Sequence, residues 1–137
     1  MTVNQETIVV GIARESAKAE PCEITLARSH PVELQVYAEH FGSMTFAGGD
    51  LFEALAALRL RLEQDQYLLL CNGARKDAFP SRMSREMGGG RKIYLLKQGV
   101  QGRREDLVDI FGGALYDQVG TVAEQHSAYD AWIRSLK

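Results

Sequence analysis

The sequence predicts an α+β fold in which helices pack on one face of a mainly antiparallel sheet, within a single domain that spans residues 1–137. Strand-like segments follow one another at short intervals, a leucine stripe with helical spacing comes next, and helical periodicity returns at the end of the chain. With 137 residues, 45% of them hydrophobic, the chain can bury one core and is too short for two ordinary domains.

The first third of the chain predicts strands that are joined as hairpins. β-branched runs and strict alternation of apolar and polar side chains mark four segments: 8–13, 22–27, 32–38 and 44–46. The intervals between them are short and contain turn residues such as Pro31 and Gly42. We therefore expect an antiparallel meander of three or four strands.

A helix is predicted where the hydrophobic period changes. Spacings of 4, 3 and 4 place four leucines on one helical face: Leu51, Leu55, Leu58 and Leu62. Asp50 and Glu53 fit the N-cap and N3 positions of a capping box. A stripe of only about three turns is typical of a core face rather than a partner-binding zipper. Arg59, Arg61 and Glu63 are then expected toward solvent or at the rim.

Two short apolar segments, 67–71 and 92–97, resemble each other and are predicted to be strands of the same sheet. Between them, 81–87 fits a short helix with Ser81 as its N-cap. Met83 and Met87 share one face of this helix, and the glycines at 88–90 end it.

The last third of the chain contains one ambiguous segment and one clear helix. Residues 105–111 fit either a brief helix stopped by the following glycines or a strand edge. Residues 121–136 return to helical periodicity, with Thr121 and Glu124 as a second capping box. Trp132 is the only tryptophan, and we expect it to anchor this helix on the sheet, because burying an aromatic ring removes a large apolar area from water.

Charge is distributed unevenly along the chain, although the net charge is only -2. Lys and Arg number 5 against 10 Asp and Glu in 1–70, 9 against 2 in 71–104, and 2 against 6 in 105–137. The basic centre could contact an anionic partner, or the acidic flanks could fold back and neutralise it. Direct nucleic-acid binding is not expected, since the pI is near 5.9 and aromatic residues make up only 8% of the chain.

The two cysteines lie in apolar, strand-like runs, which favours reduced core thiols over a disulfide framework. A nucleophilic Cys71 would need a base, and the three histidines are distant in sequence. We expect neither a metal nor a cofactor, because no Cys/His pair has ligand spacing. The chain has no apolar run of membrane-spanning length and no secretory signal at its start, so we expect a cytoplasmic protein.

The most informative stretch is 68–94, where a buried-looking strand leads into polar, cationic and glycine residues. It supplies the candidate binding residues: Asn72, Arg75, Asp77, Phe79, Ser81, Arg82, Arg85 and Arg91. Arginine, aromatic and methionine side chains inside a polar rim are typical of protein interfaces. Two other interpretations stay open. The stretch could simply form turns in a surface loop, or Asn72, Arg75, Asp77 and Ser81 could surround an anionic substrate, with Cys71 or Asp77 as the reactive group.

The segment CNGARKDAFPSRMSREMGGGRKIY, together with the later VDIF, resembles bacterial toxin-immunity proteins, including those of contact-dependent growth inhibition. The resemblance covers 68–94 and 108–111, about a quarter of the chain. It implies a compact, cytoplasmic, non-enzymatic protein that binds a cognate toxin domain, often a nuclease, and occludes its active site. We therefore expect a protein-binding module of this kind; the alternative is a small enzyme or a nucleotide- or anion-binding domain that uses the loop 71–91.

Overall fold

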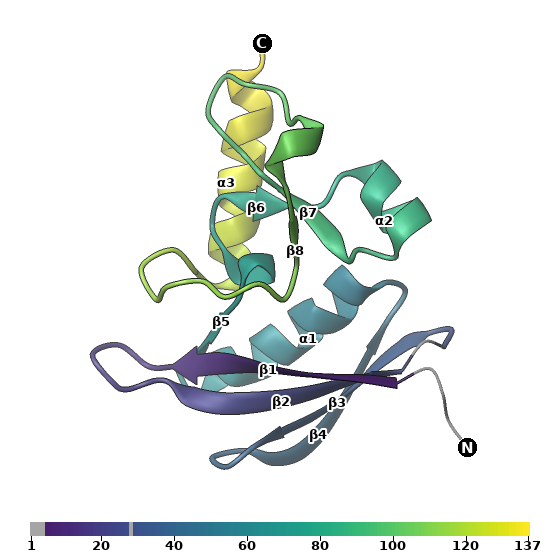
Figure 1. Ribbon diagram of the computed structural model, residues 1–137. Coiled ribbons are helices and arrows are strands. Elements are labelled where there is room, and N and C mark those ends of the chain that lie inside the picture. Colours follow the sequence, from purple (N-terminus) through teal and green to yellow (C-terminus); the bar gives the residue numbers. More distant parts are fainter. Residues whose placement is uncertain (1–4, 28) are drawn as a thin grey trace.

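The computed structural model describes residues 5–27 and 29–137, and it confirms the predicted α+β class. A five-stranded antiparallel sheet has the order β4-β3-β2-β1-β5, and a smaller antiparallel sheet has the order β6-β7-β8. In Figure 1 the large sheet lies below α1, and the small sheet, α2 and α3 lie above it.

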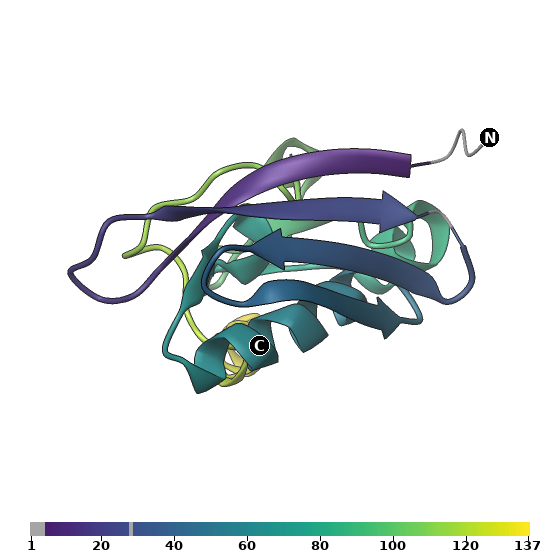
Figure 2. The ribbon, with the colours of Figure 1, turned by 90° about the horizontal axis from the view of Figure 1, so that it is seen from below.

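The predicted meander is confirmed with four strands: β1 (Gln5–Ala13), β2 (Glu20–Ala27), β3 (Val32–Ala38) and β4 (Gly42–Gly48). Alternation sets which face each side chain occupies. Ile24 and Leu34 point into the core and are fully buried, whereas Glu23 and Gln35 are exposed on the other face. Figure 2 views the molecule from below, with the meander in front of the helices.

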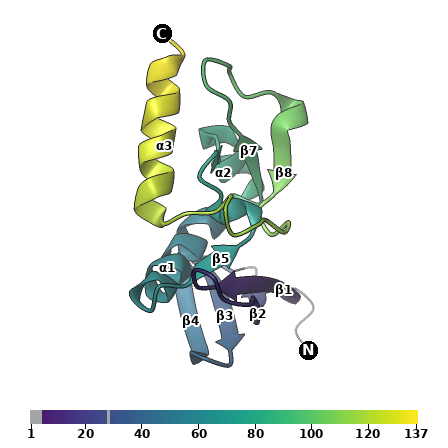
Figure 3. The same cartoon turned by 90° about the vertical axis from the view of Figure 1, so that its left-hand side faces the viewer.

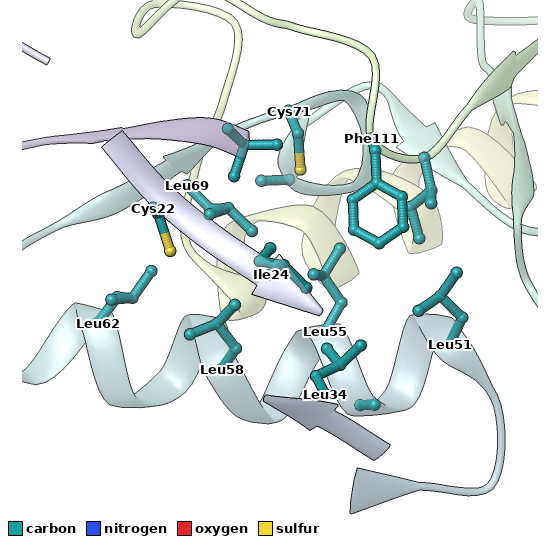
Figure 4. Packing of buried hydrophobic residues seen from close by; sticks show 14 of the residues in the cluster. Cys22, Ile24, Leu34, Leu51, Leu55, Leu58, Leu62, Leu69, Cys71 and Phe111 are labelled. Atoms are coloured by element: carbon teal, nitrogen blue, oxygen red, sulfur yellow. The ribbon is translucent and has the colours of Figure 1, made fainter. Parts of the chain in front are cut away.

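The leucine stripe covers the inner face of this sheet as predicted. Helix α1 (Leu51–Gln64) buries all four leucines, which Figure 4 shows packed in one cluster with the sheet residues Ile24 and Leu34. Asp50 caps the helix, because its Oδ1 accepts a hydrogen bond from the Glu53 N–H at 2.8 Å. Burial of this apolar stripe is what fixes α1 on the sheet.

The prediction that 67–71 and 92–97 belong to one sheet is wrong. β5 (Leu68–Leu70) pairs with β1 at the edge of the large sheet, whereas β7 (Lys92–Leu95) pairs with β6 (Ala78–Phe79) and β8 (Leu107–Asp109) in the small one. The chain leaves the large sheet after β5 through a 3-10 turn, η1 (Asn72–Ala74). Both segments are apolar and short, and this pattern does not specify the partner strand.

The remaining two helices begin directly after the N-cap residues that the sequence predicted. α2 (Arg82–Gly88) is capped by Ser81 and ends at Gly89, whose φ of +65° suits glycine. α3 (Val122–Ser135) has both halves of the Thr121–Glu124 capping box. The ambiguous segment 105–111 contains the end of a second 3-10 turn, η2 (Arg104–Asp106), and then strand β8.

Trp132 does not anchor α3 on the sheet. Its ring is only half-buried, and its Nε1–H donates to the carbonyl of Val100 in the loop after β7, at 2.9 Å. The buried residue of α3 is instead Gln125, one turn into the helix. None of the helices in the described part of the chain is long and apolar enough to cross a membrane.

Candidate functional site

The first half of the stretch 71–91 is largely buried, apart from the exposed side chains of Lys76 and Asp77. Cys71 forms an isolated antiparallel β-bridge with Gly113. The Asn72 N–H donates to the Gly112 carbonyl at 2.7 Å, and the Gly73 N–H donates to the Ile110 carbonyl at 2.9 Å. These bonds hold η1 against the chain that follows β8. From Ser81 onward, most of the stretch lies on the surface.

Acidic residues from both flanks neutralise two of the predicted arginines. The Arg85 Nε lies 2.6 Å from Oδ2 of Asp50. Arg91 binds Glu6 at 2.9 and 3.1 Å and Asp109 at 3.1 and 3.2 Å. Burial alone would raise the pKa of Asp109, but the Phe111 N–H and the Arg91 guanidinium outweigh it and lower that pKa. The interpretation in which the acidic flanks fold back is therefore correct for these cations.

Two other predicted arginines are paired within their own segments. Arg75 forms a bidentate pair with Asp77, with both N–O distances at 2.8 Å, and its side chain is only 18% exposed. Arg82 pairs with Glu86 one turn further along α2, at 3.1 Å, but both side chains are largely exposed. An exposed pair of this kind contributes little stability, so Arg82 remains available to a partner.

The other three predicted residues have structural roles. The Asn72 side chain donates to the Asp109 carbonyl at 3.0 Å, and the Ser81 hydroxyl accepts from the Ser84 N–H. Phe79 is buried and stacks on Tyr129 with ring centroids 3.9 Å apart. The residues proposed to surround an anionic substrate therefore do not converge on one point.

A buried polar unit was missed by the sequence analysis. Arg59 was predicted at the rim but is only 2% exposed, and it donates to the carbonyls of Gly73 and Gly120 and to Oε1 of Gln125. Burial lowers the Arg59 pKa. The Gln125 amide donates in turn to the carbonyls of Gly73, Arg75 and Ala78. The sequence contained one signal for the burial of Arg59: it follows Leu55 by four residues and so lies on the same helical face as the leucine stripe.

The cysteines are core residues rather than nucleophiles. Cys71 is fully buried, and burial raises its pKa to about 11, although the nearby N–H groups and Arg59 oppose this shift. Burial likewise raises the pKa of Cys22 to about 12. Among residues 5–27 and 29–137, no three His, Cys, Asp or Glu side chains are grouped so that they could hold a metal ion.

Helix α2 is the part of the stretch that faces solvent. It buries none of its own residues, and Met83 and Met87 are 69% and 83% exposed. Figure 1 shows the helix projecting from the side of the molecule. The Arg85–Asp50 pair and the Leu51 N–H, which donates to the Gly89 carbonyl at 2.8 Å, fix it to the start of α1. The helix is thus held in place from one side only.

Two grooves flank α2. One, of about 810 Å³, runs toward the turn between β2 and β3 and is lined by residues that include His30, Asp50 and Arg85. The other, of about 330 Å³, lies between the start of α2, β7 and the end of α3. We call Arg82, Met83, Met87 and these two grooves the α2 surface. The arrangement offers apolar, aromatic and cationic groups to another molecule.

Comparison with known proteins finds no family model that matches this chain and no curated protein that matches it.

Proposed function

We propose that this protein is a non-enzymatic protein-binding module that uses the α2 surface. The observation that carries the proposal is the exposure of Met83 and Met87 on a helix with no buried side chain. Methionine adapts its shape to irregular apolar surfaces and is enriched at protein interfaces, as are arginine and aromatic residues. A partner that covers these side chains would remove their apolar area from water.

More specifically, we propose that the partner is a toxin domain and that the protein is its immunity partner. The resemblance to immunity proteins includes the whole of α2, since it runs over 68–94. A projecting helix that is fixed at one side can enter a concave site and exclude substrate from it. The proposed mechanism is therefore occlusion rather than chemistry, with fast association where the charges are complementary.

The alternative, a small anion-binding domain or enzyme, is not favoured by the geometry. Its central residue was Arg75, and the Arg75 side chain is only 18% exposed and is paired with Asp77, which argues against this alternative. In the structure Asp77 binds Arg75 through two hydrogen bonds, and Asn72 is turned away toward Asp109. Cys71, the proposed reactive group, is fully buried.

The test is co-expression with any candidate toxin domain that a neighbouring gene encodes, with growth rescue and direct binding as readouts. The wild type should restore growth and bind the toxin domain. Met83→Ser combined with Met87→Ser should weaken binding about tenfold or more, because loss of a central apolar anchor costs about 1–2 kcal/mol. Leu115→Ser is the matched control, since Leu115 is 66% exposed but lies outside the α2 surface.

Two results would contradict the proposal. If the toxin domain neither binds nor is neutralised by the wild type, the immunity function is wrong. If binding occurs but the methionine variant and the Leu115 variant bind equally well, the contact surface lies elsewhere on the molecule.

A further inference from the structure

No helix or strand of the described chain covers the outward side of the meander. Along β1–β4, every second side chain points into the core under α1, and the others point away from it. Figure 2 views this outward side, and Figure 3 shows α1, α3 and the small sheet on the opposite side of the strands. We call the outward side chains of β1–β4 the outer face.

The strand register arranges the outer face in rows that cross the sheet. One row consists of Val9, Glu23, Tyr37 and Ser43, and the next consists of Thr7, Thr25, Gln35 and Thr45. Val9 and Tyr37 are 63% and 52% exposed. Each is the direct neighbour of Glu23 on an adjoining strand, so the Glu23 side chain stands between two exposed hydrophobic side chains.

The charge of the outer face is entirely acidic. A third row consists of Gln5, Ala27, Glu33 and Ala47. The three rows thus contain Glu23 and Glu33 but no lysine, arginine or histidine. Neither carboxylate forms an ion pair with any residue that the structure describes. A face of this charge attracts cationic groups and repels nucleic acid and acidic protein surfaces.

A hollow lies on this face beside Glu23. It has a volume of about 250 Å³, and its lining includes Thr25, Gln35, Tyr37 and Ser43. Their hydroxyl and amide oxygens can accept hydrogen bonds, and Glu23 is the only charged residue in the lining. An arginine or lysine side chain fits this chemistry, because its methylene groups can cover Tyr37 while its cation meets the carboxylate.

The two glutamates also define the spacing of the cations that would match them. Glu33 pairs with Ala27, which follows Glu23 by four residues along β2, so the two carboxylates belong to rows four residues apart. In an extended segment, side chains four residues apart point the same way and are separated by about 13 Å, which is the same interval along the sheet. The row between the two glutamates is polar, so a small polar side chain suits the middle position of such a segment.

We propose that the outer face binds an extended segment of a partner protein in which two arginines or lysines are four residues apart. One cation would meet Glu23 between Val9 and Tyr37, and the other would meet Glu33 beyond the threonine row. This inference goes beyond the proposed function, because the outer face and the α2 surface share no residue.

Nuclear magnetic resonance of the isotope-labelled full-length protein tests the proposal, because it locates the residues that a weak ligand contacts. The probe is a short blocked peptide with two arginines four residues apart and a serine midway between them. It should shift the amide signals of Val9, Glu23 and Tyr37 in a saturable way, and added salt should weaken its binding.

Two control peptides test spacing and charge. One places the arginines three residues apart, so that they point to opposite sides of an extended segment. It should bind about fivefold more weakly, because it loses one of the two ion pairs. The other control replaces both arginines by glutamate and should not bind.

Glu23→Gln combined with Glu33→Gln tests the two carboxylates directly. This variant keeps the size of both side chains and should weaken peptide binding about fivefold or more, because neither arginine then finds a charged partner. Glu86→Gln combined with Glu105→Gln is the matched control. It changes the net charge equally, at side chains that are 64% and 69% exposed and lie outside the outer face. Circular dichroism checks that each variant is folded.

Several results would overturn the inference. It fails if no peptide binds, if both arginine spacings bind equally well, or if the shifted signals lie outside β1–β4. It fails as well if the two glutamine variants weaken binding equally, because net charge alone then explains the attraction. A shift of the same signals with protein concentration alone would overturn it too, since a second copy then covers the outer face.

The inference and the proposed function can fail separately. The variant with Met83→Ser and Met87→Ser should bind the arginine peptide as the wild type does. The variant with Glu23→Gln and Glu33→Gln should bind the toxin domain as the wild type does. Loss of toxin binding only in the methionine variant, without any peptide binding by the wild type, would leave the proposed function standing and overturn this inference.

Discussion

Arg59 and Gln125 form one buried polar unit that joins α1, η1 and α3. The Arg59 guanidinium lies 2.6 Å from Oε1 of Gln125. Together the two side chains donate to four backbone carbonyls, those of Gly73, Arg75, Ala78 and Gly120. No buried side-chain nitrogen or oxygen in the described part of the chain lacks a hydrogen-bond partner. Buried polar groups are costly unless they are satisfied, so this unit specifies how the three elements fit together.

Gln125→Leu should therefore destabilise the protein strongly. The substitution removes the donor to three backbone carbonyls and an acceptor for the buried Arg59, and we expect the free energy of unfolding to fall by about 3 kcal/mol. Urea unfolding measures the change. The matched control is Gln98→Leu at an exposed position, which should alter stability by no more than about 0.5 kcal/mol. Equal effects of the two variants would mean that the buried unit contributes nothing specific.

The buried thiols give stability a dependence on alkaline pH. Burial raises the pKa of Cys71 from 9.0 to about 11 and that of Cys22 to about 12. Above pH 9.0 the thiols of the unfolded chain lose protons that the folded chain retains, so the free energy of unfolding falls as pH rises toward 11–12. Below pH 9.0 both states keep these protons, and the effect is absent.

Urea unfolding as a function of pH tests this prediction for one thiol at a time. In Cys22→Ala the decrease between pH 9.0 and about 11 should be smaller than in the wild type, whatever the variant's stability at neutral pH. An unchanged pH slope would show that Cys22 titrates normally in the folded protein.

At the residue scale, the sequence predicted which side chains share a helical face, but it did not predict which distant residues those side chains contact. The leucine stripe was predicted correctly because spacing alone decides which side chains share a helical face. Arg59 was placed at the rim because arginine usually lies there, and its hydrogen-bond partners in η1 and α3 are far away in the sequence. The pairing of Arg85 with Asp50 was equally invisible, since these residues meet only after folding.

Element η1 fits into the core without space for a side chain at Gly73. A Cβ atom there would lie 2.5 Å from Cγ1 of Ile110 and 2.7 Å from Cδ2 of Leu55. Gly73→Ala should therefore force η1 away from α1 and lower the free energy of unfolding by about 1–3 kcal/mol. Gly113→Ala is the matched control, because nothing lies within 4 Å of its Cβ position. Similar stabilities of the two variants in urea would show that the core expands easily at η1.

Helix α2 depends on Arg85 for its attachment. The guanidinium binds Asp50 and lies over the Phe52 ring, with its Cζ 5.4 Å from the ring centroid. Arg85→Ala should speed amide hydrogen exchange in 82–88 while exchange in α1 stays slow, because α2 buries no side chain that would hold it. Arg82→Ala removes only an exposed pair and should leave exchange nearly unchanged. Equal protection in both variants would mean that the hydrogen bond from the Leu51 N–H to the Gly89 carbonyl is enough to hold α2 in place.

At the element scale, local signals predicted boundaries and failed to predict pairing. Alternation and caps located the four meander strands and the starts of α1, α2 and α3 within a few residues. Local signals could not assign β5 and β7 to different sheets, because strand pairing depends on contacts between distant segments. Spacing predicted that Met83 and Met87 share one face of α2, but it did not predict the exposure of that face. The smaller groove beside α2 forms only when segments from β6 to α3 come together.

At the scale of the whole molecule, ion pairs between the basic centre and the acidic flanks of the sequence join the two sheets. Arg91, from the basic centre, bridges Glu6 on β1 and Asp109 on β8, and its Cζ lies 5.2 Å from the ring centroid of Phe111. The segregated charge of the sequence thus becomes a set of contacts between the large sheet and the small one.

Because shared contacts join the two sheets, we expect the protein to unfold as one cooperative unit. Far-UV circular dichroism follows all the helices and strands, while Trp132 fluorescence follows only the end of α3, so the two signals should share one midpoint in urea. Arg91→Gln should lower the free energy of unfolding by about 1–2 kcal/mol, because its two ion pairs are half exposed. Both midpoints should move together in this variant. Separate midpoints in the wild type would show that the sheets fold independently. Separation only in Arg91→Gln would show that this one side chain couples them, because the apolar contacts between the sheets are then too weak to do so alone.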